Sequence, residues 1–157
     1  MNMRRNLENG ARRDKGREVT MLSARYLGEF LSISEYVYYS LLLEGDYPEL
    51  SELFERAAQS ALGRYRAVGA MLLRMGEYPS LSIQPRGRKM SSREMSGTES
   101  REIDAMISDA IERERRGIAE YDRLIGYTQN SELLNSLPSV LSSKRDTLSM
   151  LERTFNS

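Results

Sequence analysis

LSARYLGEFLSISEYVYYSLLL, residues 22–43, forms a single apolar face when it is wound as a helix. Steps of three and four residues, typical of a helix face buried in a bundle, connect its members. One member of this face is charged, and it lies near the middle. The members are Leu22, Tyr26, Glu29, Ile33, Tyr36, Ser40 and Leu43.

Three further stretches repeat this arrangement, each with one charge inside an apolar face. The charged residues are Arg64 within 50–75, Glu114 within 103–125 and Lys144 within 134–155. An unpaired charge in such a place costs roughly several kcal/mol, so each of the four needs a partner or a ligand. Two acids and two bases can satisfy one another.

The spacing predicts four helices over about residues 20–43, 48–75, 98–127 and 131–155. Pro48 suits the first turn of the second helix, and Gly76 suits its end. Pro138 predicts a kink or a late start in the fourth helix. The long connection over residues 77–98 is rich in Gly, Pro and Ser. We therefore expect an all-α four-helix bundle of two antiparallel helical hairpins joined by a long crossover, in one domain over 19–157. Residues 1–18 are expected to be a flexible, basic N-terminal arm.

Composition restricts the chemistry. The 157 residues include no histidine and no cysteine, and the formal net charge is zero. Disulfides, thiolate metal sites and histidine-based catalysis are excluded. The basic stretches at residues 4–17 and 86–93 lack interleaved aromatic residues, so we expect no nucleic-acid partner. No segment is apolar enough to span a bilayer, and the charged N-terminus does not resemble a secretory signal. A cytoplasmic protein without a membrane partner is the expectation.

A weak internal repeat links the first and third predicted helices. Glu29, Ser32, Ile33, Glu35 and Tyr36 match, at the same relative spacing, Glu114, Gly117, Ile118, Glu120 and Tyr121. The shared pattern is E-x-x-small-I-x-E-Y. Because it recurs in the first helix of each hairpin, duplication is the favoured explanation. A two-fold arrangement of the hairpins would bring Glu29 and Glu114 toward each other.

These residues resemble the ferritin-like superfamily, the di-iron four-helix bundles of the bacterioferritin and rubrerythrin type. GEFLSISEY at 28–36 is similar to the first helix of that family, and residues 114–121 are similar to its third helix. MGEYP at 75–79 falls where the family has L-G-G-x-P after its second helix. The resemblance covers about residues 20–156.

The resemblance implies a site for two irons, or sometimes manganese, with six ligands. Matched position by position, Glu29 and Glu114 are kept. The second helix has Ala61 and Arg64 in place of glutamate and histidine, and the fourth has Lys144 and Thr147 in the same roles. Four of the six ligands are therefore absent, and two replacements are cations that repel a metal ion at short range.

We expect Glu29, Arg64, Glu114 and Lys144 to form a buried salt-bridge cluster in place of metal. The planar fork of Arg64 suits two carboxylate oxygens. Tyr36 and Tyr121 are expected to line the cluster and to donate hydrogen bonds to Glu29 or Glu114, together with Ala61 and Thr147 as lining residues. Glu35 and Glu120 are expected to face outward.

Three functions remain open. The first is a non-catalytic structural or interaction module without a cofactor, acting as a homo-oligomer with an unidentified protein partner. The second is an iron- or manganese-dependent oxidoreductase with a rearranged carboxylate site around Glu29 and Glu114. The third is binding of a small ligand in a cavity near four small residues, Ser32, Ala57, Ala61 and Gly117. The favoured alternative is that the larger side chains of Tyr36, Tyr121 and Arg64 fill that volume.

Overall fold

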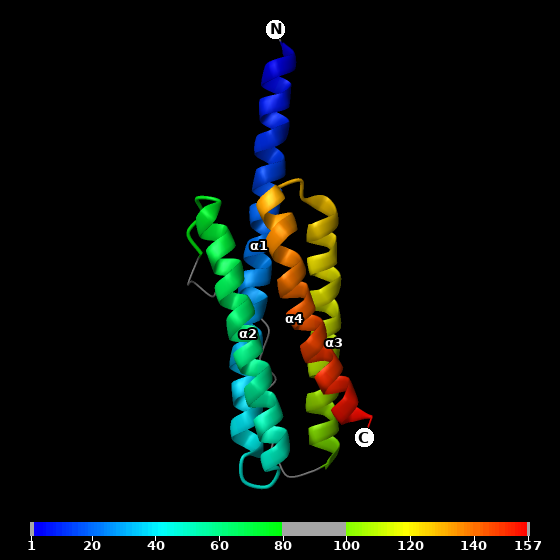
Figure 1. Cartoon of the computed structure of the whole chain (residues 1–157). Helices are drawn as coiled ribbons and strands as arrows, with labels where there is room; N and C mark the ends of the chain where they lie inside the picture. Colours follow the sequence, from blue (N-terminus) through cyan, green and yellow to red (C-terminus); the bar gives the residue numbers. More distant parts are fainter. Residues whose placement is uncertain (1, 80–99, 157) are drawn as a thin grey trace.

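The computed structural model describes residues 2–79 and 100–156, and this part of the chain is all-helical, without a strand. The helices are α1 (Asn2–Leu43), α2 (Pro48–Arg74), α3 (Ser100–Tyr127) and α4 (Ser131–Phe155). α1 and α4 run downward in Figure 1, whereas α2 and α3 run upward. The prediction of an all-α chain with four long helices is confirmed.

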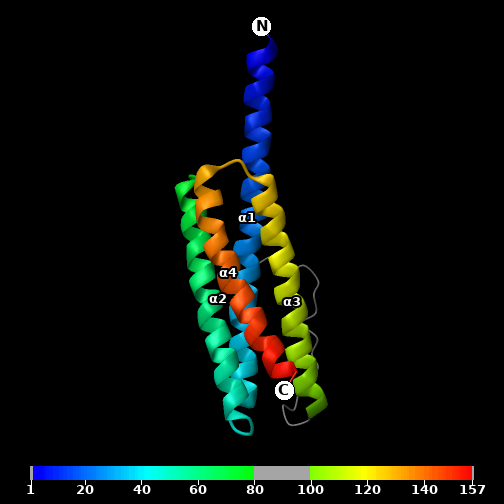
Figure 2. The same cartoon turned by 45° about the vertical axis from the view of Figure 1, so that its right-hand side comes forward.

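The four helices pack as two antiparallel pairs. α1 packs most closely on α2, and α3 on α4, while α2 also contacts α4 and α1 also contacts α3. Figure 2 shows the same side-by-side arrangement from a second direction. α2 ends at the upper end in Figure 1 and α3 begins at the lower end. Most of the expected long connection, and the expected cap Thr98, lie outside the described residues.

Local sequence explains the ends of α2 and α4. Pro48 occupies the first turn of α2. At the other end, Gly76 adopts a φ of 80°, and the amides of Gly76 and Glu77 bond to the carbonyls of Leu73 and Leu72 at 3.0 Å each. This is a Schellman motif, and its left-handed residue favours glycine. Asn130 caps α4 by accepting bonds from two backbone amides through Oδ1.

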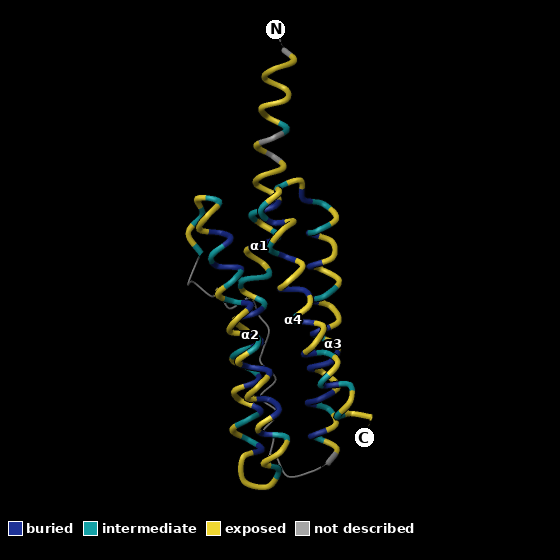
Figure 3. The backbone as a smooth tube through the Cα atoms, in the orientation of Figure 1, coloured by how far each residue is buried: buried dark blue, intermediate teal, exposed yellow. Residues whose placement is uncertain are grey.

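Two predictions about helix ends are wrong. The first helix begins at Asn2 instead of near Thr20, whose hydroxyl bonds to the Gly16 carbonyl inside the helix. Residues 2–17 are therefore a helical extension that projects past the other helices and is largely exposed (Figure 3). Their arginine, leucine, lysine and glutamate residues favour a helix even without an apolar face. α4 also starts before Pro138, which is exposed inside the helix, so a late start is wrong.

The apolar core has two parts. One part, around Tyr36, Phe54 and Ile107, occupies the end near the α1–α2 turn. The other, around Leu22, Met71 and Leu137, lies near the α3–α4 turn. On every helix, the residues that belong to the two parts are separated by the charged residue singled out in the sequence. A polar layer thus crosses the middle of the core.

Candidate functional site

The polar layer contains one charged side chain from each helix, and all four are removed from water. Glu29 comes from α1, Arg64 from α2, Glu114 from α3 and Lys144 from α4, with exposed fractions of 1%, 2%, 0% and 4%. The structure therefore brings together the four residues that the sequence analysis selected. Buried ion pairs join them.

Glu29 accepts from both cations. Arg64 Nε donates to Oε2 at 3.0 Å, and Lys144 Nζ donates to Oε1 at 3.3 Å. The hydroxyl of Tyr121 also donates to Oε1, at 2.9 Å. Glu29 thus has three donors, which compensate for the removal of its carboxylate from water.

Glu114 has fewer partners. The Tyr36 hydroxyl donates to its Oε1 at 2.5 Å, and Lys144 Nζ lies 3.0 Å from its Oε2. The Lys144–Oε2 contact is an ion pair whose geometry is poor for a hydrogen bond, and Oε2 has no hydrogen-bond donor among the described residues. The ammonium of Lys144 therefore stands between the two carboxylates and contacts both.

Arg64 is held by α4 as well as by Glu29. Its Nη1 donates to the hydroxyls of Ser143 and Thr147, at 3.2 and 3.1 Å. Its Nη2 is buried without an acceptor in the described part of the chain. The expected two-pronged contact with two carboxylate oxygens is not formed, because only Nε reaches Glu29. Thr147 lines the cluster as predicted, while Ala61 is fully buried in the adjoining apolar core.

Gly117 makes room for Lys144. A Cβ at position 117 would overlap with Lys144 Cε and would lie 3.0 Å from Nζ, which is tighter than most real Cβ contacts. The small position of the repeat on α3 is therefore filled by the lysine side chain. Its counterpart Ser32 on α1 is buried and bonds to the Gly28 carbonyl at 3.1 Å. The space considered for a small ligand beside Gly117 is occupied by this side chain.

The two tyrosines are uncharged donors. Burial, and after it the negative charge of Glu114, raises the pKa of Tyr36 well above its usual value. Burial, and after it the charge of Glu29, likewise raises the pKa of Tyr121. Both hydroxyls therefore keep their protons through the neutral range and serve the carboxylates as donors.

Two further arginines flank these tyrosines. Arg113 pairs with Glu35 and lies 5.9 Å from the Tyr36 ring centre, and Arg25 pairs with Glu120 and lies 5.9 Å from the Tyr121 ring centre. Burial lowers the pKa of Arg113 to about 10. Glu35 and Glu120 thus bridge α1 and α3 instead of simply facing outward.

Arg25, Arg113 and Ser143 were not predicted from the sequence. The repeat gave a signal for the arginines, since Glu35 and Glu120 occupy matched positions and each needs a cation. Ser143 gave little signal, because a serine beside an apolar stripe is common on exposed helix faces.

The donor set does not fit a di-metal centre. Among residues 2–79 and 100–156, no group of three or more acidic, histidine or cysteine side chains is arranged to hold a metal ion. Two carboxylates are present, but a fixed ammonium lies between them and a guanidinium adjoins one.

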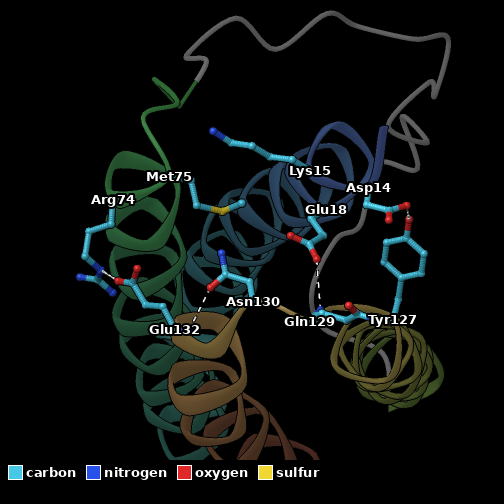
Figure 4. A pocket seen from close by; sticks show the side chains of 9 residues that line it. All are labelled: Asp14, Lys15, Glu18, Arg74, Met75, Tyr127, Gln129, Asn130 and Glu132. Atoms are coloured by element: carbon cyan, nitrogen blue, oxygen red, sulfur yellow. Dashed lines mark hydrogen bonds and ion pairs between the residues drawn. The ribbon is translucent and has the colours of Figure 1, made fainter. Parts of the chain in front are cut away.

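A separate hollow of about 610 Å³ lies where the α1 extension meets the α3–α4 turn (Figure 4). Glu18 in its wall accepts from Thr128 Oγ1 at 2.8 Å and from the Gln129 amide at 3.3 Å. Tyr127 donates to Asp14 at 3.1 Å, and Arg74 pairs with Glu132. These contacts fasten α1 and α2 to the α3–α4 turn.

No protein-family model, curated protein or solved structure matches this chain. The ferritin-like resemblance therefore depends on the residues of the chain itself. In the described ranges, no helix has both the length and the apolar character that crossing a bilayer requires.

Proposed function

We propose that this chain is a ferritin-like four-helix bundle that has lost its di-metal centre and serves as a non-catalytic structural or interaction module. Homo-oligomerisation, with a cytoplasmic location, is part of the proposal. The observation that carries it is the place of Lys144 Nζ, 3.0 Å from a Glu114 oxygen and 3.3 Å from a Glu29 oxygen. In a di-iron bundle, the charge of these two carboxylates would instead be neutralised by the bound metal ions.

The reciprocal bonds between the two halves support this reading. Tyr36 on α1 donates to Glu114 on α3, and Tyr121 on α3 donates to Glu29 on α1. These are the matched positions of the internal repeat, so the layer has approximate two-fold symmetry in its acids and tyrosines. Paired carboxylates from the first and third helices are what a di-metal bundle uses.

The decisive experiment restores the four missing ligands. The variant carries Ala61→Glu, Arg64→His, Lys144→Glu and Thr147→His, which removes both cations and, with Glu29 and Glu114, brings the number of carboxylates to four. We expect it to bind two divalent ions per chain, because two ions neutralise four carboxylates. Cobalt titration followed by visible absorbance, with helical content from circular dichroism, measures this. The matched control is the unaltered chain, for which we expect no binding.

The proposal fails if the quadruple variant binds no metal, whether folded or unfolded. It also fails if the unaltered chain, purified without chelators, carries stoichiometric iron or manganese that a Glu29→Gln, Glu114→Gln variant loses. The second result would instead assign the chain to metal-dependent oxidoreductases with a rearranged carboxylate site.

A further inference from the structure

The outer face of α1 differs in charge from that of α3. Between Met21 and Leu43, not one exposed position is charged. Most exposed positions of α3 are charged. The three charged residues of this part of α1, Arg25, Glu29 and Glu35, all pair with other helices. The exposed large side chains are Leu27, Phe30, Leu31, Val37, Tyr38 and Leu41.

The face continues onto α2. Phe30 lies 5.9 Å from Tyr65, ring centre to ring centre, and Leu62 stands one turn before Tyr65 with 46% of its surface exposed. Taking about 150–250 Å² for a fully exposed large side chain, these residues offer roughly 600 Å² of apolar surface. Doubled across two copies, that reaches about 1,200 Å², the lower end of specific protein interfaces. A patch of this size indicates a partner.

The spacing of the face identifies the partner as a second copy. Counted from Ser34, Leu31 and Val37 lie three residues away on either side, Phe30 and Tyr38 four, and Leu27 and Leu41 seven. An antiparallel copy of α1 centred on Ser34 therefore meets the same pattern of positions. Isologous two-fold contacts require this self-complementarity. The small exposed Ser34 at the centre lets the two helices approach closely.

Charge at the two ends favours the antiparallel direction. Arg12, Lys15 and Arg17 are exposed before the face, where the exposed acids are Glu8 and Asp14. Exposed acids follow it, in Glu44, Asp46 and Glu49. Antiparallel copies place the basic end of one chain toward the acidic end of the other, whereas parallel copies would place like charges together.

We infer that two copies of this chain associate through the outer face of α1, antiparallel, with their two-fold axis at Ser34. This inference rests on the part of the proposed function that makes the chain a homo-oligomer. It does not depend on whether the polar layer has replaced a metal site.

The first test is the mass of the full chain by sedimentation velocity. We expect a species of about twice 18.0 kDa. Leu31→Lys buries two ammonium groups in the interface, and we expect it to raise the dimer Kd about 100-fold or more. The matched control is Leu134→Lys on α4, because Leu134 is 40% exposed and Leu31 is 45% exposed. The control is expected to leave the dimer unchanged.

The second test uses the absence of cysteine in the chain. Ser34→Cys places the only thiol next to its own copy, so mild oxidation or a short bismaleimide is expected to cross-link the dimer. Ser108→Cys, on an exposed position of α3, is the control and is expected to stay uncross-linked. Because Ser34 is exposed, this test also works if Leu31→Lys misfolds.

Three outcomes overturn the inference. A dimer without a Ser34→Cys cross-link uses another face, which leaves the proposed homo-oligomer standing. A monomer at 100-fold the working concentration contradicts both the interface and the homo-oligomer. The proposal that the polar layer replaces a metal site is tested separately, by the cobalt titration of the quadruple variant. A monomer that co-sediments with phosphatidylcholine vesicles assigns the face to a lipid surface.

Discussion

Glu29 and Glu114 occupy matched positions of the repeat, but their removal should have unequal consequences. In Glu29→Gln, Arg64 loses its carboxylate and keeps only the hydroxyls of Ser143 and Thr147. In Glu114→Gln, both cations still contact Glu29, because Arg64 Nε and Lys144 Nζ donate to different oxygens of that carboxylate. Only the first substitution leaves a buried cation without a counter-charge.

The magnitudes follow from this difference. Breaking a buried pair by removing one partner costs about 3–5 kcal/mol, and we expect Glu29→Gln to fall in that range. Glu114→Gln keeps an oxygen acceptor for Tyr36 and removes one contact of Lys144, so about 1–3 kcal/mol is expected. A double variant, Glu29→Gln with Arg64→Met, removes both members of the pair. It should be more stable than Glu29→Gln alone.

The assay is urea unfolding followed by helical circular dichroism, with equal m-values required for the comparison. The coupling energy between positions 29 and 64 comes from the double-mutant cycle with Arg64→Met. Equal costs for Glu29→Gln and Glu114→Gln, or strict additivity in the cycle, would refute the assignment of Arg64 to Glu29. So would a small loss in both single variants.

Three further predictions use the same assay. Gly117→Ala should lower the free energy of unfolding by about 1–3 kcal/mol, because the added Cβ meets the Lys144 side chain. Gly63→Ala, at an exposed helical glycine with open space around it, should raise the free energy of unfolding by about 0.4–1 kcal/mol, and equal effects of the two substitutions would contradict the packing. Burial raises the pKa of Tyr39 to about 12, so the contribution of its neutral hydroxyl to the free energy of unfolding is complete below pH 10 and is lost as the pH rises toward 12. Tyr39→Phe should make the loss of stability over this pH range smaller, and an unchanged pH profile would contradict the prediction. Deleting residues 1–12 should change the unfolding free energy by less than about 0.5 kcal/mol, since the described side chains there are largely exposed; a larger loss would show packing in the extension.

Apolar periodicity predicted the helices that carry a buried face, and it failed where no such face exists. α2, α3 and α4 end within two residues of their expected bounds. The extension at residues 2–17 has no stripe, so only helix propensity supports it. Pro138 lies inside α4, which begins at Ser131, so of the two expectations at this proline, a kink or a late start, the late start is wrong.

For the polar layer, the sequence predicted which side chains meet but could not predict how each one bonds. Tyr36 and Tyr121 were expected to donate to Glu29 or Glu114, but the sequence did not determine which tyrosine bonds to which acid. Whether the Arg64 fork reaches one carboxylate or several depends on the axial offset between helices, which spacing along one helix does not encode. The contact with Ser143 depends on the same offset.

The polar layer also determines how the two hairpins dock. Each hairpin brings one acid and one base, so each is neutral in this layer. Most of the bonds nevertheless cross between hairpins, in Tyr36 to Glu114, Tyr121 to Glu29, Lys144 to Glu29 and Arg64 to Ser143 and Thr147. Sliding one hairpin by a helical turn, about 5.4 Å, would break all of them and leave buried donors of Tyr36, Tyr121 and Arg64 without acceptors. The ion pairs within each hairpin, Arg64–Glu29 and Lys144–Glu114, would persist. Apolar contacts on either side could re-form after such a slide, whereas the bonds of the polar layer that cross between the hairpins could not. Its contribution is therefore to the register of the two hairpins more than to the net free energy of folding, which agrees with the small net worth of buried ion pairs.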